Sequence, residues 1–392
     1  MRRGYCRITS VIVTQALCEL VISHLALTDY KRRLPASLLA RLMLLAAAMG
    51  RSLSFVAQRC DEAPSDETLR RAVLYNLPGP ELLRARLLAA LHSLLPRRLF
   101  RRAGPAALDF HQRPFYGDKD TPGVRGGKRE AGTRYFWTYA TLVLLSRGQR
   151  YTVGFCQVAR GETQEQAVCR LLEQARQAGI RLRYLLMDRA FHDAAVIASL
   201  QERGIPFVVP MTRRGDEGRG SGTAPFFRRG QGGGWASHTW SARVTRWDEA
   251  KQKEVRGKGV RVTVGVCVVP RGGGRRPLVF AAWRIGWPPC MVRSRYRTRF
   301  GIETSYRQLG EVLGATTSKD QRVRLLLLGL ALLLRQYWCL TMDQEGSASQ
   351  GRGAALRLVE LRTWLVIELA QILRLRLEVR TDPPGGPTLT AA

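Results

Sequence analysis

Acidic residues are scarce in this sequence. Its 392 residues contain 31 Asp and Glu against 63 Lys and Arg, which gives a formal net charge of +32. Such a charge repels itself unless a polyanion is nearby, so nucleic acid is the favoured partner and an anionic membrane surface the weaker one. Because most of the basic residues are Arg, GC-rich coding can account for part of this excess.

Paired cysteines and long apolar runs are also absent. None of the eight cysteines belongs to a Cys-x-x-Cys pair, so we expect reduced core cysteines of a cytosolic protein and no zinc site. The most apolar run, residues 325–334, is too short to span a bilayer and predicts a buried helix. The basic N-terminus lacks a convincing secretory cleavage site. We therefore expect a cytoplasmic protein without membrane contact.

Residues 1–100 are predicted to form a helical domain. Apolar helices are expected at residues 37–50 and 52–59, followed by a break that ends at Pro64. Ser65 is a suitable N-cap for the next helix, which has acidic residues in its first turn and carries Arg70 and Arg71. This arrangement is compatible with a helix-turn-helix reader of DNA, in which Arg70 and Arg71 contact the nucleic acid. An ordinary helical bundle that packs on the next domain is the alternative.

Residues 106–211 alternate between strand and helix patterns in the order β-β-β-α-β-α-β. Asp109 lies on the first strand and Asp188 ends the fourth. Sites in open α/β sheets form at the carboxyl ends of strands, so the two Asp would be neighbours if these strands pair. We therefore predict an α/β fold: a ribonuclease-H-like mixed sheet flanked by helices.

The composition changes again after this segment. Residues 212–277 are rich in Gly and Arg and then in period-two runs, which predicts a β-rich insertion with mobile loops. Residues 278–340 are expected to complete the catalytic domain begun at 106–211. A helical region at 341–380 and a disordered tail at 381–392 follow.

Residues 294–314 are predicted to form one helix, with Ser294 as its N-cap and Gly314 as its stop. Helical spacing places Tyr296, Arg299, Glu303 and Arg307 on one face. An apolar stripe for packing on a core runs beside them: Ile302, Tyr306, Leu309 and Leu313.

Glu303 has two interpretations at this point. A carboxylate flanked by arginines is often an ion-paired surface residue. Alternatively, Glu303 points into a basic groove and holds a metal ion, while Tyr296, Arg299 and Arg307 face phosphates.

Three carboxylates on separate elements favour the second interpretation: Asp109, Asp188 and Glu303. Mg²⁺ prefers oxygen ligands, and two such ions about 4 Å apart can activate a water or a 3′-hydroxyl and stabilise the leaving oxygen. The structural alternatives are that Asp109 caps a loop and that Asp188 pairs with Arg189 or the next helix. His192 could order the same site, although a solvent-facing His is an equal alternative.

The motifs around these acids resemble those of DDE transposases. Met187-Asp188-Arg-Ala-Phe191 is similar to the signature around the second Asp of that family. Tyr296-x-x-Arg299-x-x-x-Glu303 matches most of the tyrosine-arginine-glutamate-lysine signature of its insertion-sequence-4 group. Ala107-Leu-Asp109 is similar, more weakly, to the region of the first Asp. The resemblance covers residues 106–340.

The resemblance implies a fold, an activity and partners. It implies a ribonuclease-H-like domain with a β insertion, and metal ligation by Asp109, Asp188 and Glu303 to two Mg²⁺ ions, with Mn²⁺ able to substitute. It further implies cut-and-paste transposition with double-stranded DNA as partner, both the terminal inverted repeats and the target, in a dimeric DNA complex. Tyr296 and Arg299 would contact the element-end backbone. The setting would be the nucleoid of a bacterial or archaeal cytoplasm.

One position departs from the signature. The signature lysine falls seven residues after Glu303, where this chain has Gly310. Arg307, one turn earlier on the same face, is the candidate substitute for that phosphate contact. A catalytically inactive, DNA-binding derivative and a structure-selective nuclease on the same fold therefore remain alternatives to an active transposase.

Overall fold

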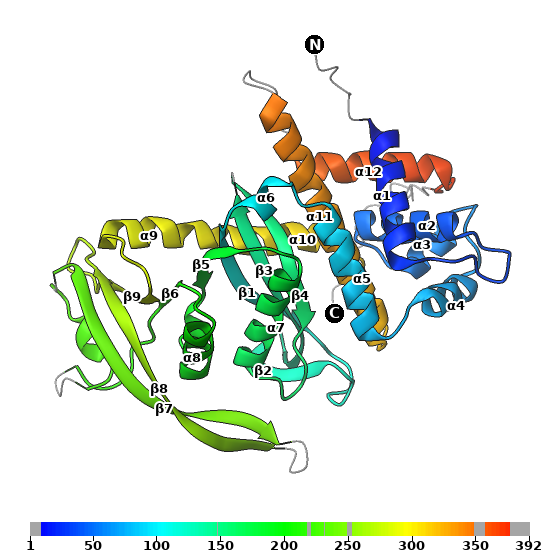
Figure 1. Cartoon of the computed structure of the whole chain (residues 1–392). Coiled ribbons are helices and arrows are strands. Elements are labelled where there is room, and N and C mark those ends of the chain that lie inside the picture. Colours follow the sequence, from blue (N-terminus) through cyan, green and yellow to red (C-terminus); the bar gives the residue numbers. More distant parts are fainter. Residues whose placement is uncertain are drawn as a thin grey trace, which may run out of the picture.

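The computed structural model describes residues 9–146, 148–217, 221–230, 232–248, 253–348 and 357–376. A central sheet lies between a helical part and a long β hairpin (Figure 1). The tail predicted at 381–392 lies outside the described residues.

The described strands form one mixed sheet of nine members, in the order β2-β3-β1-β5-β6-β9-β8-β7, with β4 also paired to β3. Strands β1 and β5 are parallel neighbours, and Leu108 pairs with Met187. The expected adjacency of the strands that carry Asp109 and Asp188 is therefore present. The strands are β1 (Gly104–Pro114), β2 (Val124–Glu130), β3 (Thr133–Ser146), β4 (Gln149–Gln157), β5 (Leu182–Met187), β6 (Phe207–Pro210), β7 (Gly234–Asp248), β8 (Lys253–Val269) and β9 (Leu278–Trp283).

Helices cover both faces of this sheet. Side chains alternate between the faces along a strand. Leu108 of β1 belongs to a core with α7 (Gln164–Gln177) and α8 (Ala194–Glu202). Ala107 belongs to the core on the other face, which α9 (Pro289–Arg297) and α10 (Gly301–Glu311) cover. Asp109 shares the face of Ala107, so the strand period directs it toward α9 and α10.

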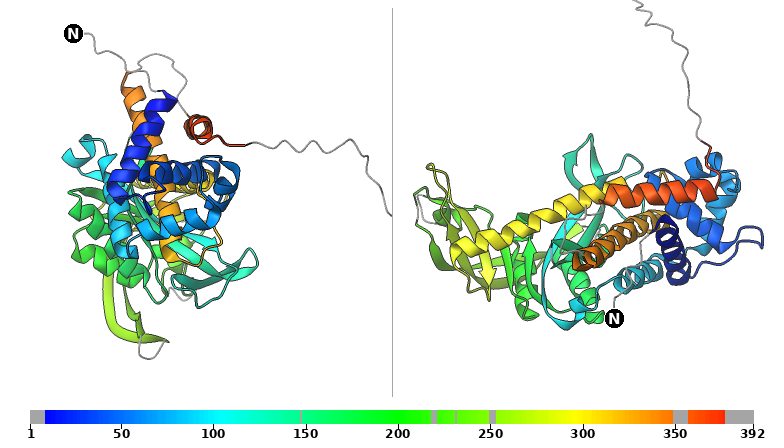
Figure 2. Two further views of the ribbon diagram at one scale, coloured as in Figure 1. Left: turned by 90° about the vertical axis from the view of Figure 1, so that its right-hand side faces the viewer. Right: turned by 90° about the horizontal axis from the view of Figure 1, so that it is seen from above.

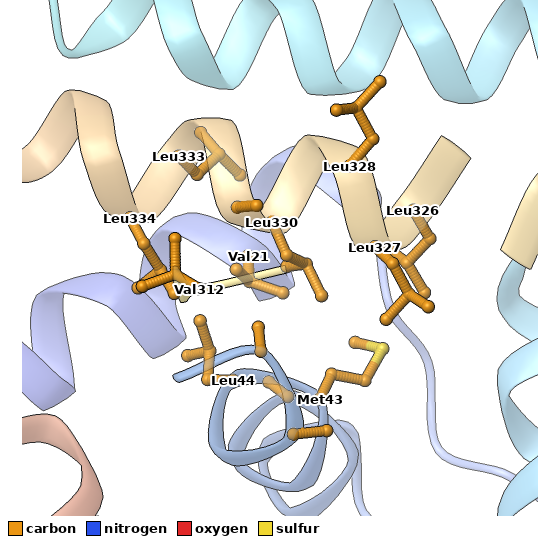
Figure 3. Close-up of a cluster of buried hydrophobic side chains, with 14 of the residues drawn as sticks. Val21, Met43, Leu44, Val312, Leu326, Leu327, Leu328, Leu330, Leu333 and Leu334 are labelled. Carbon is orange, nitrogen blue, oxygen red and sulfur yellow. The ribbon is translucent and has the colours of Figure 1, made fainter. Parts of the chain in front are cut away.

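The predicted N-terminal domain shares its hydrophobic core with α11 and α12, two C-terminal helices. Figure 2 shows the arrangement of these helices from two further directions. Leucines of α11 such as Leu330 pack against Val21 and Leu44 from the N-terminal helices (Figure 3). The domain boundaries remain a prediction. The helices are α1 (Ser10–Leu25), α2 (Ala36–Met49), α3 (Leu53–Arg59), α4 (Asp66–Asn76), α5 (Pro80–Ser93), α6 (Arg98–Arg101), α11 (Gln321–Ala348) and α12 (Leu358–Ile372).

The apolar run at residues 325–334 lies inside α11, which is 28 residues long. Within the described residues, α11 is apolar and long enough to cross a membrane, and α2 with α3 would pass the same test only as one sharply bent pair. Most of the apolar window of α11 is buried inside the protein, at 78%. The expectation of a buried core helix is therefore confirmed.

Three predicted elements differ in the structure. The helix expected at 294–314 begins earlier, at Pro289, because a proline fits the first turn of a helix. A short 3-10 turn, Thr298–Phe300, separates it from α10, which ends at Glu311 rather than at Gly314. Strand β2 is absent from the predicted order β-β-β-α-β-α-β, because its polar residues give no strand pattern. The helical region predicted at 341–380 contains a helix, α12, that is shorter than this range, Leu358–Ile372.

The region expected to be a β-rich insertion continues the main sheet. Strand β8 pairs with β9, and β9 pairs with β6 beside β5. The valines Val262, Val264 and Val266 of β8 join the core under α8. The β7–β8 hairpin then extends beyond the sheet (Figure 1). This region is rich in strands, as expected, and part of it lies in the same sheet as β1 and β5.

Candidate active site

The three predicted carboxylates converge on one buried cation, the guanidinium of Arg299. Nη1 of Arg299 lies 3.3 Å from Oδ2 of Asp109. Nη2 lies 3.2 Å from Oε1 of Glu303 and 3.7 Å from Oδ1 of Asp188. Acids separated by up to 194 positions in the chain, from Asp109 to Glu303, therefore meet at a single point.

The site lies where the carboxyl end of β5 and the middle of β1 face the junction of α9 and α10. Asp188 directly follows β5 and Glu303 lies in the first turn of α10. The side chains of Asp188 and Glu303 are 46% and 57% exposed, whereas that of Asp109 is 16% exposed. One carboxylate is therefore anchored, and two can reach solvent and a substrate.

Arg299 is itself held from within the protein. Only 3% of Arg299 and 6% of Tyr296 are exposed, and Nε of Arg299 donates a hydrogen bond to the Tyr296 hydroxyl at 3.1 Å. The predicted contact of both residues with a DNA backbone remains a prediction. In the structure they instead form the inner wall of the carboxylate cluster, because the α9–α10 junction packs against the sheet.

Asp109 is fixed by its own backbone and by α10. Its Oδ1 accepts the Phe110 N–H at 2.9 Å. The Tyr306 hydroxyl donates to the Asp109 carbonyl at 3.0 Å and lies 2.7 Å from Oγ1 of Thr141. Burial raises the pKa of Asp109 to about 6, against the lowering effect of Arg299 and of the Phe110 N–H. Asp109 is therefore mainly ionised at pH 7.

The donor set suits a hard divalent cation, since it consists of carboxylate oxygens. Among the described residues, no group of three His, Cys, Asp or Glu is close enough to hold one metal ion as arranged. The guanidinium takes the central position, and it balances three negative charges that would otherwise repel one another. Each of these ion pairs uses one oxygen of its carboxylate.

The remaining predicted DNA contacts lie elsewhere. Arg307 is exposed on α10, and its Nη2 lies 3.3 Å from Oγ1 of Thr304. Arg70 and Arg71 both form ion pairs with Glu67 on α4. Helix α4 belongs to the helical part, away from the junction of α9 and α10 (Figure 1). The structure thus brings Arg307 to the helix of Glu303, but not Arg70 and Arg71.

Sequence reasoning missed a pocket of ≈ 560 Å³ beside Asp188. Its walls include Phe280 and Phe300, and Arg189, Arg293 and Arg297 contribute positive charge. The arginine spacing around residue 295 was visible in the sequence. These side chains share the pocket with the end of β6 because β6 pairs with β9, a long-range contact that the sequence pattern does not reveal.

Comparison with known proteins identifies the family of this chain. The family model described as "Transposase DDE domain" matches residues 114–335, more than half of the chain. The chain belongs to the DDE transposase family. The match begins after Asp109, so the assignment of the first Asp depends on the geometry above. This transposase is accordingly a DNA-cutting, strand-transferring enzyme.

A solved structure shares the transposase fold. It is described as "Cryo-EM structure of piggyBac transposase synaptic complex with hairpin DNA", with a TM-score of 0.56 and 11% sequence identity. The alignment covers 96% of this chain and 84% of that one. At this identity the likeness confirms the ribonuclease-H-like fold and nothing finer. No curated protein matches the chain significantly.

His192, near Asp188, is buried in this transposase, so a solvent-facing position is excluded: 4% of it is exposed. Its Nδ1 accepts the Thr212 N–H at 3.4 Å, and its ring lies 5.3 Å from that of Trp240. Burial, reinforced by Arg214 and His238, lowers the pKa of His192 from 6.5 to about 4. His192 is therefore neutral at pH 7, and it links the segment after Asp188 to the β7–β8 hairpin.

This burial predicts acid sensitivity. Because the folded pKa of about 4 lies below the unfolded 6.5, the neutral ring favours folding at pH 7. That contribution, about 3 kcal/mol at most, is lost as the pH falls from 6.5 through 4. His192→Phe should flatten the dependence of the urea midpoint on pH between 7 and 4, and His24→Phe on α1 should not. Identical curves for wild type and His192→Phe would contradict this assignment.

Proposed function

We propose that this chain is a cut-and-paste transposase of the insertion-sequence-4 group, which cleaves the ends of its element and joins them to target DNA with Mg²⁺. The observation that carries the proposal is the convergence of Asp109, Asp188 and Glu303 on one cationic centre. The family match supports the reaction class, and DDE transposases generally use divalent metal ions.

Asp109, Asp188 and Glu303 would hold two Mg²⁺ ions, for which Mn²⁺ could substitute. When bound, these ions activate the attacking water or 3′-hydroxyl and stabilise the leaving oxygen. The protein's own contribution is positional. Tyr306 fixes the backbone of Asp109, and the exposed carboxylates of Asp188 and Glu303 can move toward a substrate.

Arg299 is proposed to exchange partners during this reaction. In the structure its guanidinium neutralises the carboxylates, and it lines the same pocket as Arg293 and Arg297. A DNA phosphate at this pocket offers an alternative acceptor for the guanidinium. The exchange would release the carboxylates for metal, so DNA and metal should bind cooperatively.

The proposed partners are the element's inverted-repeat ends and the target DNA, bound by a homodimer. The net charge of +32 suits such a polyanion. The structure similar in fold is a synaptic complex with hairpin DNA, according to its title. The products of the cleavage assay will show whether the reaction of this chain also forms a DNA hairpin.

The test is cleavage of end-labelled element-end DNA by purified protein with Mg²⁺. We expect a nick that leaves a 3′-hydroxyl, no nick in EDTA, and joining of that end to a second duplex. Binding without cleavage in either Mg²⁺ or Mn²⁺ would replace the proposal with an inactive derivative. Cleavage of branched DNA irrespective of sequence, without joining, would indicate a structure-selective nuclease.

Gly310 offers a separate test of the departure from the signature. It is exposed on α10, and a Cβ added there would meet nothing within 4 Å. Gly310→Ala and Gly310→Lys should each raise the free energy of unfolding by about 0.5–1 kcal/mol, because glycine is unfavourable in a helix.

Only the lysine variant should also bind DNA more tightly. We expect its plot of log affinity against log salt to steepen by about one unit, as for one added phosphate contact. Equal DNA binding by the Ala and Lys variants would show that this position does not face DNA.

A further inference from the structure

A second cavity of ≈ 310 Å³ lies between the end of β1 and the start of α11. It is lined by three cations and no carboxylate, within the part of the chain that the structure describes. The two Thr hydroxyls of the connection between α10 and α11 add polar groups. The lining that matters is Arg113, Thr316, Thr317, Lys319 and Arg324.

Arg324 is pre-oriented in this cavity. Its guanidinium lies 5.3 Å from the ring centroid of Phe115 and 4.9 Å from that of Trp137. Its Nε donates to the Ser318 carbonyl at 2.7 Å. Neither Nη of Arg324 donates a hydrogen bond to any described residue. A guanidinium fixed by two rings and one carbonyl therefore keeps its outer edge available to an acceptor.

The positive charges that line the cavity have no carboxylate partner among its lining residues. Arg113 and Lys319 are exposed and make no ion pair in the described residues. Burial and, to a smaller extent, Arg113 lower the pKa of Arg324, against the raising effect of Tyr139, so two like charges lie close together here. A bound anion would relieve this repulsion, and fork-shaped guanidinium donors match phosphate oxygens.

The cavity lies on the same face of β1 as the candidate active site. Asp109, His111 and Arg113 alternate onto one face of the strand, and Tyr306 of α10 stacks on His111 at 4.7 Å. Four residues along a strand span about 13 Å. An anion in the cavity would therefore sit within a few nucleotides of a bond held at the carboxylates, since duplex DNA rises about 3.4 Å per nucleotide.

We propose that this cavity, between Arg113, Lys319 and Arg324, binds one backbone phosphate of the DNA that the carboxylate site cuts. The contact fixes the register of the strand without reading its sequence, because a phosphate is the same at every nucleotide. This inference rests on the proposed function for its ligand, but its test uses binding alone.

The experiment is a scan of the element-end duplex with single neutral methylphosphonates, with binding measured in EDTA so that cleavage plays no part. Wild type should lose about tenfold in affinity at the phosphate that occupies the cavity. The double variant Arg113→Gln, Lys319→Gln should bind more weakly and lose this sensitivity at that one position. The slope of its log affinity against log salt should flatten by about one unit, as for one lost phosphate contact.

Arg183→Gln is the matched control, because Arg183 is exposed near the start of β5, at the end of the strand away from Asp188. The methylphosphonate scan of Arg183→Gln should match that of wild type. The proposal is overturned if the double variant keeps the wild-type sensitivity at every position, or if wild type binds no DNA. Inorganic phosphate at constant ionic strength should not compete. Competition would mean that the cavity holds free phosphate instead, and would overturn the DNA assignment.

This design tests the cavity proposal and the proposed function of the carboxylate site independently. A scan that identifies the cavity phosphate in a protein that never cleaves would support the cavity and refute the proposed reaction. If the double variant shows metal-dependent cleavage and an unchanged methylphosphonate scan, the proposed reaction is supported and the cavity proposal is refuted.

Discussion

Glu303→Gln should abolish metal-dependent cleavage, with a rate at least about 10³-fold below wild type. The change keeps the size of the side chain but removes the charge that a divalent cation requires, which is worth several kcal/mol in the transition state. Glu311→Gln is the matched control, because Glu311 is also an exposed glutamate on α10. It should cleave at the wild-type rate in the labelled-end assay.

The two variants also separate chemistry from binding. Arg299 keeps Asp109 as a partner in Glu303→Gln, so the fold and the affinity for DNA in EDTA should be preserved. A calorimetric titration with Mg²⁺ in the presence of DNA should show weaker metal binding for Glu303→Gln alone. Wild-type cleavage by Glu303→Gln, or equal losses in both variants, would remove Glu303 from the site.

Gln336→Leu should produce the largest loss of stability, about 3–5 kcal/mol. Gln336 is fully buried on α11. Its Oε1 accepts the Thr152 N–H at 2.7 Å, and its Nε2 donates to the carbonyls of Leu91 and Thr152, both at 3.0 Å. Leucine fills the space but leaves the buried N–H and carbonyl of Thr152 without this partner, at about 1–3 kcal/mol for each unsatisfied group. The Leu91 carbonyl loses one donor and keeps the Leu94 N–H, at 3.2 Å.

The effect has a clear control in Gln371→Leu. Gln371 is exposed on α12, so its replacement should change the free energy of unfolding by no more than about 0.5 kcal/mol. Urea unfolding followed by circular dichroism measures both. An unchanged urea midpoint for Gln336→Leu would mean that this amide does not tie the helical part to the sheet.

Local sequence patterns predicted most of the elements, since helix and strand periods are properties of short segments. Ser65 caps its helix, as predicted. The buried run of α11 and the strands that carry Asp109 and Asp188 were also readable. Helix α9 begins at Pro289, ahead of the predicted N-cap Ser294, because proline is favoured in the first turn of a helix.

The sequence by itself determined the chemistry available to this protein: three acids on separate elements, a large excess of positive charge, and an order of strands and helices in which the strands of Asp109 and Asp188 would be neighbours if they pair. Only the tertiary structure decided that Arg299 lies among the acids, 190 positions from Asp109 in the chain. It also decided that β8 joins the main sheet and that Arg113 and Arg324 share a cavity. Such contacts follow from the packing of distant segments, which no local period encodes.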